Sequence, residues 1–508
     1  MRTSLVIFFL GLLLQNSLGQ TSLWLGGVDS HSAKLIAFPT PHQTKQLGFW
    51  EILDPASGII RRLPLKTSKI GNSLVWAAEV NNLDENRSYL YRLIANGQDT
   101  GYSGSFKTFS TGSIGFRFIA SSCSFALGSP AYLPMMDFNP HLFLHLGDLH
   151  YGDINNGLVE DHLQAYPVRF LKGKKEQAFC QQVTMDYIWD DHDYCGNNSA
   201  GPSACGNAAR EAYLNGFPGY APYRQDAGIA HSFQNGRVRF IALDLRSERT
   251  DSTIMSLEQM NWLKNELIVA QQSNQLSIIL SSVSWYGNEN DNWGGFSNNR
   301  KEIIEFIQQN NLHRVAIICG DAHMNALDDG RNQVDLNQNH ASNNRQKDGF
   351  PVIQAGALLS FGSNKGGNYS HGSFVNPAGA GQWVECQIID NDAGAIALQV
   401  KGQQMLAGYL KPNRLFQETF FWPIETPSKQ SDFFSIERVD EKICVNISIS
   451  PETVGSLYRL KTSKGIILDA AAACEFNSLK LSAALSTGIE SIFLEEERLG
   501  YYRVFPVK

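Results

Sequence analysis

The sequence has few of the features that mark membrane, nucleic-acid-binding or disulfide-scaffold proteins. Beyond its first twenty residues, no run reaches the roughly 18 consecutive apolar residues that a membrane span needs. Lys and Arg form no cluster, and 42 basic against 49 acidic residues give a net charge of −7, which excludes a general attraction for nucleic acid or anionic lipid. Eight cysteines in 508 residues are too few for a disulfide scaffold, although they allow a few bridges. What remains is a mildly acidic globular chain whose length predicts about two to four domains.

The N-terminus is typical of a cleavable signal peptide. Met1 and Arg2 form a short basic start, residues 5–14 are mostly apolar, and small residues follow at 16–19. This apolar run is too short to cross a bilayer. We therefore expect residues 1–20 to be removed and the protein to be secreted, periplasmic or attached to the cell surface. The alternative is an ordinary N-terminal strand.

The spacing of apolar residues predicts three domains in the remaining chain. Residues 21–112 alternate like short strands separated by turns, which predicts a β-sandwich of the immunoglobulin or fibronectin type without its disulfide. In residues 113–405, apolar strands alternate with helices near 257–271 and 301–309, which predicts a layered α/β domain. Ser256 and Gln259 form a capping box that predicts the start of the first of these helices. Residues 406–508 are rich in strand patterns and carry no motif that we can interpret. Two polar segments, 338–347 and 363–372, are expected to be loops that border a site.

Four strands of the α/β domain end in residues that can bind metals. The strands at 116–120 and 142–146 lead to Cys123 and to Asp148 with Tyr151. The next strand leads to the run Asp190–Asp193, in which three carboxylates surround a histidine and would repel one another without a cation. The strand at 314–319 leads to Asp321 and His323. Because ligands bind beyond the carboxyl ends of strands in α/β sheets, we expect these residues to share one site.

The chemistry of this set fits a hydrolytic site with two metal ions. Carboxylates suit hard ions such as Ca²⁺, Mg²⁺ or Mn²⁺, whereas thiolate and imidazole suit iron or zinc. Two adjacent ions can hold the attacking and leaving oxygens of a phosphoryl displacement. One of them can also lower the pKa of a bound water molecule and so create the nucleophile.

Taken together, the motifs resemble those of the PhoD-like alkaline phosphatase family of metallophosphatases. The likeness covers about residues 116–400 and rests on six elements in the same order: Ser-Cys-Ser, Gly-Asp-Leu-His-Tyr-Gly-Asp, Trp-Asp-Asp-His-Asp-Tyr, Asp-Leu-Arg-Ser, Ser-Ser-Val-Ser-Trp and Gly-Asp-Ala-His-Met-Asn. The resemblance implies a four-layer metallophosphatase-type β-sandwich flanked by helices, with a β domain before it. The Asp-x-His element and the fourth-motif histidine of classical metallophosphatases are absent. Cys123 and the pair Ser284-Trp285 occupy their positions, which fits the PhoD-like branch.

The resemblance also implies a role for each matching residue. Fe³⁺ would be held by four ligands, namely Cys123, Asp148, Tyr151 and His323. Ca²⁺ would be held by Asp148, Asp191 and Asp321, with Asp148 bridging the two sites; Mn²⁺, Mg²⁺ or Zn²⁺ are alternatives. His192 would be the general acid beside the leaving group.

Three further features concern substrate binding and folding. Arg246 follows another strand and could grip phosphate oxygens; the alternative is a structural Asp–Arg pair. Asn207 is a further candidate for contact with the second metal or the substrate. Cys195 with Cys205, and Cys444 with Cys474, could form disulfides after export.

The sequence therefore predicts an exported metal-dependent phosphatase that hydrolyses small phosphate esters through metal-activated water or hydroxide. One alternative is a phosphodiesterase or phospholipase D-like enzyme on the same fold, because the pocket decides the type of ester. The other is a non-catalytic binding or adhesion protein. The acidic balance of the chain argues against long nucleic acids as substrates.

Overall fold

A computed structural model describes residues 22–39, 48–95, 97–287, 290–332, 349–363, 365, 367–390 and 395–424, together with the backbone of seven strands between 434 and 506. The chain divides into two compact units. The larger unit contains residues up to 112, 116–386 and 400–418, and the second contains 113–115, 387–399 and 419–508. In the described residues, no helix is long and apolar enough to cross a membrane.

The larger of two central sheets has ten strands. Three parallel strands, β9 (Phe116–Ser121), β10 (Leu142–Leu146) and β11 (Thr184–Ile188), lie at its centre and are almost entirely buried. The full order is β21 (Asn413–Pro423), β20 (Ala395–Met405), β19 (Gly381–Ile389), β9, β10, β11, β1 (Ser22–Gly26), β2 (Ala33–Phe38), β6 (Ser73–Val80) and β5 (Lys66–Ile70).

A seven-stranded sheet packs against the ten-stranded one. Its order is β12 (His231–Asn235), β13 (Val238–Ala242), β14 (Leu276–Ser281), β15 (Val315–Cys319), β17 (Val352–Gln354), β16 (Met324–Asp328) and β18 (Ser373–Val375), with β13, β14, β15 and β17 parallel. Phe118 of β9 meets Phe240 of β13 edge-on, with ring centroids 5.4 Å apart and both side chains fully buried. The core therefore lies between the two sheets.

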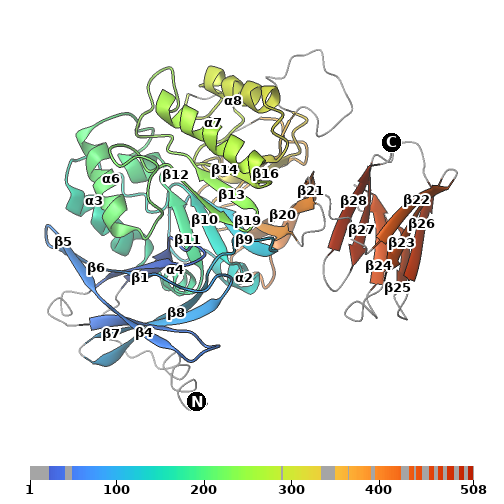
Figure 1. Ribbon diagram of the computed structural model, residues 1–508. Helices are drawn as coiled ribbons and strands as arrows, with labels where there is room; N and C mark the ends of the chain where they lie inside the picture. The colour runs from blue at the N-terminus through green and yellow to red at the C-terminus, as the bar shows by residue number, and fades with distance from the viewer. Residues whose placement is uncertain are drawn as a thin grey trace. The chain divides into compact units, whose positions relative to one another are not determined.

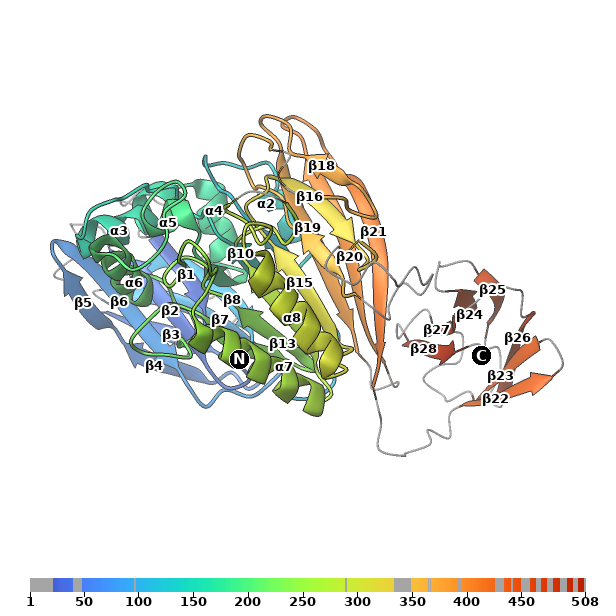
Figure 2. The same cartoon turned by 90° about the horizontal axis from the view of Figure 1, so that it is seen from above.

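Helices cover the outer faces of these sheets. Two long helices, α7 (Leu257–Gln272) and α8 (Ser297–Gln309), lie side by side over the seven-stranded sheet (Figures 1 and 2). The expected cap of α7 is present, because the Ser256 hydroxyl accepts a hydrogen bond from the Gln259 backbone. The other described helices accompany β10 and β11: α2 (Tyr132–Asp137), α3 (Val159–Ala165), η3 (Tyr166–Phe170), α4 (Lys174–Cys180), α5 (Asp191–Tyr194) and α6 (Ala204–Gly216). The predicted mixed α/β class is confirmed.

The N-terminal strands are divided between two sheets. β3 (Gly48–Leu53), β4 (Ile60–Pro64), β7 (Ser88–Ala95) and β8 (Gln98–Lys107) form a four-stranded sheet, as seen at the bottom of Figure 1. β1, β2, β5 and β6 instead extend the ten-stranded sheet, because β1 pairs in parallel with β11. Residues 22–112 thus belong to the same compact unit as the core. A separate sandwich domain ending at 112 stays a prediction.

Beyond residue 424 the chain is described only through the backbone of its strands. β22 (Phe434–Val439), β23 (Lys442–Ser448) and β26 (Ser478–Ala484) form one sheet, and β25 (Ile467–Ala472), β24 (Leu457–Thr462), β27 (Ser491–Glu496) and β28 (Tyr501–Pro506) form another. Three predictions lie outside the described residues: the signal peptide at 1–20, the loop at 338–347 and the Cys444–Cys474 bridge. The domain boundary at 406 also stays a prediction.

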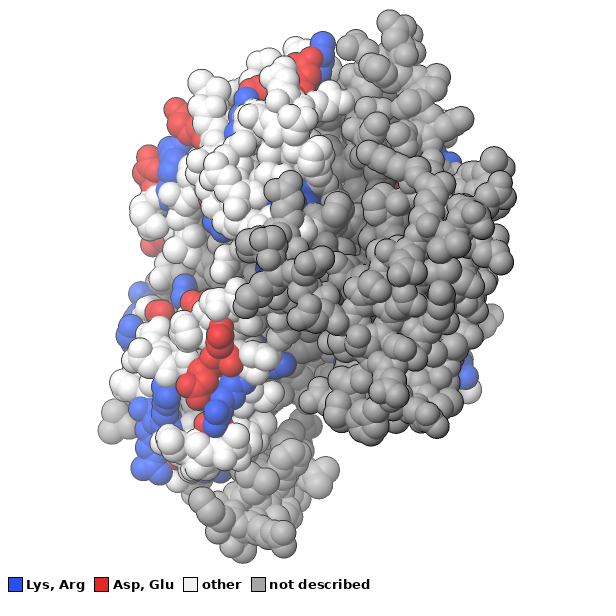
Figure 3. All heavy atoms as spheres, turned by 45° about the vertical axis from the view of Figure 1, so that its right-hand side comes forward, with Lys and Arg blue, Asp and Glu red and all other residues white. Residues whose placement is uncertain are grey.

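Charged side chains on the visible face are mixed by sign. On the described part of the face in Figure 3, basic and acidic side chains lie next to one another rather than in separate patches. This mixing agrees with the small net charge of −7.

Candidate metal centre

The candidate ligands are brought together because the two central sheets converge at the carboxyl ends of their strands. Gly320, directly after β15, shows how close this approach is. A Cβ atom at this position would lie 2.2 Å from the backbone oxygen of Leu146, the last residue of β10. Only glycine fits there, so the motif that follows β15 lies beside the motif that follows β10.

Backbone conformation singles out the same residues. Among the described residues, twelve that are not glycine have positive φ, and six of them are asparagines, which tolerate it. The other six are Cys123, Asp148, Tyr151, Asp153, Asp321 and His323, with φ between 43° and 68°. Such conformations cost energy and concentrate at functional sites. Here five of the six are candidate ligands.

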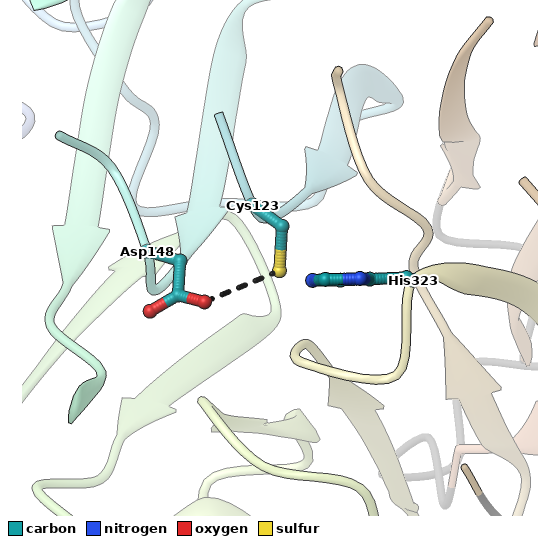
Figure 4. Close-up of side chains that lie close together, drawn as sticks. All are labelled: Cys123, Asp148 and His323. Atoms are coloured by element: carbon teal, nitrogen blue, oxygen red, sulfur yellow. Dashed lines mark hydrogen bonds between the residues drawn. The ribbon is translucent and has the colours of Figure 1, made fainter. Parts of the chain in front are cut away.

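The first group of possible ligands consists of Cys123, Asp148 and His323 (Figure 4). One donor atom from each lies within 4.8 Å of the others. The Cys123 thiol donates a weak hydrogen bond to Asp148 Oδ2 at 3.6 Å. The Tyr151 hydroxyl lies 3.3 Å from His323 Nε2, which brings the phenol to the same group. The structure therefore brings the thiol, carboxyl, imidazole and phenol together, and their role as metal ligands stays a prediction.

A second group, formed by Asp148, Asp191 and His192, shares Asp148 with the first. Asp191 accepts backbone hydrogen bonds from His192 at 2.8 Å and from Asn198 at 2.6 Å, which fix its carboxylate. A shared carboxylate between two groups of donors is the arrangement that a bridging ligand needs.

The neighbouring acidic residues have structural roles. Asp190 and Asp193 cap α5 reciprocally. Asp193 also accepts the backbone hydrogens of Leu149 and His150, both at 3.0 Å, and so holds the loop that carries Asp148. Of the three carboxylates around His192, only Asp191 belongs to a group of possible metal ligands.

The buried acidic groups of the centre favour binding of a cation. Burial raises the pKa of the Asp148 carboxyl well above its usual value, and the nearby carboxylates Asp191 and Asp190 raise it further. Burial and Asp148 likewise raise the pKa of the Cys123 thiol, and burial lowers the pKa of His323 to about 4. A bound cation would stabilise the thiolate and the carboxylates, and a neutral imidazole is ready to act as a ligand.

Two unpaired oxygen atoms support this interpretation. Asp148 Oδ1 and Asp321 Oδ2 are buried and have no hydrogen-bond partner among the described residues. A buried carboxylate oxygen without a partner is costly unless a cation occupies the space beside it. The donor set therefore fits metal binding.

Comparison with known proteins identifies the family. A family model for PhoD-like phosphatases matches residues 118–387, more than half of the chain. The chain belongs to the PhoD-like phosphatase family. Members of such a family are hydrolases of phosphoric esters, and the matched residues include every candidate ligand named above.

One solved structure shares the fold of this PhoD-like chain. A structure of PhoD is 18% identical and covers 79% of this chain and 90% of its own, with a TM-score of 0.61. This likeness shows a shared fold. A dimetal phosphatase from Danio rerio is 13% identical and covers 59% of this chain and 98% of its own, with a TM-score of 0.34, which is too low to carry an argument. No curated protein matches the sequence.

Arg246 is fully buried in this PhoD-like chain, with 0% of its side chain exposed. Nε donates to Asp190 at 2.5 Å, and the two terminal nitrogens donate to Asp291 at 2.6 and 3.1 Å. Of the two roles left open by the sequence, these contacts favour the structural Asp–Arg pair over a phosphate contact.

Asp321 and Asn207, two residues that the sequence predicted for the site, belong to neither group of possible ligands. Asp321 lies outside both groups of mutually close donors, although its charge acts on the Cys123 thiol. Its Oδ1 accepts a hydrogen bond from Lys365 at 3.0 Å. Asn207 lies in the first turn of α6 with an exposed side chain, so no observation favours a contact with metal or substrate.

Two residues at the centre were not identified from the sequence. The ammonium group of Lys365 lies beside Asp321. Lys365 belongs to a loop whose composition does not indicate which of its residues face the site. Asp153 lies 2.6 Å from His192 Nδ1. Its signal was present, since it ends the Gly-Asp-Leu-His-Tyr-Gly-Asp motif.

A polar cavity and a disulfide border the centre. The cavity has a volume of about 860 Å³ and is lined by residues that include Asn197, Asn198, Arg249 and Lys365. The predicted Cys195–Cys205 disulfide is confirmed; it joins the residue after α5 to α6. Cys123 is a free, buried thiol.

Proposed function

We propose that this chain is an exported, metal-dependent phosphatase. The observation that carries the proposal is the sharing of Asp148 by two groups of possible ligands. Membership of the PhoD-like phosphatase family supports phosphate esters as substrates. When bound, two metal ions would supply an activated water molecule and neutralise charge on the phosphate.

The donor types favour a different ion at each group. Cys123, Tyr151 and His323 offer a thiolate, a phenolate and an imidazole, which suit Fe³⁺. Asp191 and Asp321 offer hard carboxylate oxygens, which suit Ca²⁺ and leave Mn²⁺ or Mg²⁺ as alternatives. Asp148 would serve both ions.

The other residues of the centre would bind and orient the substrate. His192 would donate a proton to the departing alcohol, and Asp153 would fix its ring through the 2.6 Å contact with Nδ1. Lys365 replaces Arg246 as the candidate contact for a phosphate oxygen, because its side chain is 30% exposed whereas Arg246 is sealed. The roles of His192 and Lys365 are both inferred from the positions of their side chains.

Export and the domain plan complete the proposal. The Cys195–Cys205 disulfide is typical of an oxidising compartment and supports export, with residues 1–20 as the proposed signal peptide. Residues 21–112 would form the immunoglobulin-like part, and residues 406–508 a β-rich C-terminal region.

The proposal is tested by turnover of a generic phosphomonoester and a phosphodiester with the Asp191→Ala and Cys123→Ala variants. We expect both variants to lose most activity on either ester, because each lacks a ligand of one ion. Unchanged turnover in both would refute the assignment. The ratio of monoester to diester turnover by the unsubstituted protein separates a phosphatase from a phosphodiesterase or phospholipase D-like enzyme. A non-catalytic binding protein would turn over neither.

A further inference from the structure

Two exposed phenylalanine rings pack together near the candidate metal centre. Phe125 is 55% exposed and Phe361 is 70% exposed, and their ring centroids lie 6.0 Å apart. Phe125 belongs to the loop after β9, and Phe361 to the chain between β17 and β18. Single exposed apolar residues are common, but a pair built from distant segments forms a small apolar surface. We name Phe125 and Phe361 the aromatic rim.

The aromatic rim adjoins the catalytic histidine through Tyr151. The ring of Phe125 meets that of Tyr151 edge-on, with centroids 5.3 Å apart. The Tyr151 ring in turn lies 4.3 Å from the imidazole of His192. Phe361 is also close to the centre along the chain, because the hydroxyl of the preceding residue, Ser360, lies 3.4 Å from each ring nitrogen of His323. The residues that line the polar cavity do not include the rim.

We propose that the aromatic rim binds the apolar part of the alcohol that leaves the phosphate. The inference rests on the proposed phosphatase function. If His192 gives its proton to the departing oxygen, that oxygen must lie beside Nε2, because Nδ1 faces Asp153, and the alcohol is then close to Tyr151 and Phe125. Phenyl rings offer neither a charge nor a hydrogen bond to a phosphate or a polyol, whereas an aryl ring or an alkyl chain gains from packing against them. The substrate class is thus a phosphate ester whose alcohol carries such a group.

The test measures kcat/KM for a series of straight-chain alkyl phosphates below their micelle concentration, with glycerol phosphate as a polar ester. Burial of each added methylene is worth roughly a two- to fourfold rise in kcat/KM for the first few carbons. We expect Phe361→Ala to flatten this rise, so that its loss of kcat/KM grows with chain length and is smallest for glycerol phosphate. At 70% exposure, loss of the ring creates no internal cavity. Leu257→Ala, at an equally exposed position of α7, is the matched control and should keep the rise.

Each outcome decides the proposal. Turnover that does not depend on chain length, or that depends on it equally in Phe361→Ala, overturns the aromatic rim and leaves the phosphatase function standing. Absence of turnover for every ester overturns both. A change in oligomeric state of Phe361→Ala without a change in the chain-length dependence would show that the rim covers an interface between copies, which also overturns the proposal. Phe125→Ala, with metal content measured alongside, provides the second variant because its ring contacts Tyr151.

Discussion

The structural role of Arg246 predicts a large loss of stability when its charge is removed. In Arg246→Met, Asp190 would keep the hydrogen bond from the Ser282 hydroxyl at 2.8 Å and its role in the cap of α5. It would lose its charged partner while remaining buried, with 1% of the residue exposed. Asp291 would keep Arg249 Nη1 at 2.8 Å. Removing one partner of a buried ion pair costs about 3–5 kcal/mol, because the remaining charge is left without compensation. We place Arg246→Met in this range, chiefly through Asp190.

Urea unfolding measures this effect, and a double variant isolates its cause. Arg246→Met combined with Asp190→Asn should be less destabilised than the sum of the single variants, since the unpaired charge is gone. Lys301→Ala is the control: it breaks a pair with Glu305 in which the side chains are 58% and 51% exposed, and it should change stability little. The reasoning fails if Arg246→Met unfolds within about 0.5 kcal/mol of the unsubstituted protein, the range of ordinary surface changes. A rise in KM at unchanged stability would instead indicate a phosphate contact.

Three further predictions follow from the same structure. Lys365→Ala should lower kcat/KM for a phosphomonoester by about tenfold to a hundredfold, which corresponds to the loss of one charged hydrogen bond. Lys264→Ala on α7 is the control and should leave kcat/KM unchanged. If the two variants have the same kcat/KM, Lys365 does not contact the substrate. Burial lowers the pKa of His145 from 6.5 to about 3, so the unfolded chain takes up a proton in this range and the free energy of unfolding should fall as pH decreases from 6.5 toward 3. His145→Gln should reduce that slope in urea titrations, and an unchanged slope would contradict the assignment. Gly320→Ala should destabilise by about 1–3 kcal/mol through overpacking, while Gly112→Ala, whose Cβ would meet nothing within 4 Å, should be neutral in thermal unfolding.

The sequence was most informative where structure is local. The period of apolar residues located the strands that precede Cys123 and Asp148, and Ser256 marked the start of α7. The motifs at the strand ends were recognisable because parallel strands deliver their carboxyl ends to one edge. Asp148 could be named as the shared carboxylate from family resemblance, and the two groups of donors are consistent with that role.

Contacts between distant segments were beyond the sequence. The partners of Arg246 lie 56 and 45 residues away, and no local pattern shows that Asp190 and Asp291 enclose it. Lys365 is 44 residues from Asp321 and belongs to a loop without periodicity. The pairing of β1 with β11 likewise joins the start of the chain to its centre. These features depend on tertiary packing, which single-sequence patterns do not encode.

The most direct test of the account is the metal content of the Asp148→Asn variant, measured by mass spectrometry on folded, purified protein beside Cys123→Ala and Asp191→Ala. Because Asp148 belongs to both groups of donors, its substitution should reduce both ions, whereas each of the other variants should chiefly reduce one. Two ions per chain in the unsubstituted protein and the loss of both in Asp148→Asn is the predicted result. Retention of both ions by Asp148→Asn, or no metal in the unsubstituted protein after loading with iron and calcium, would contradict it.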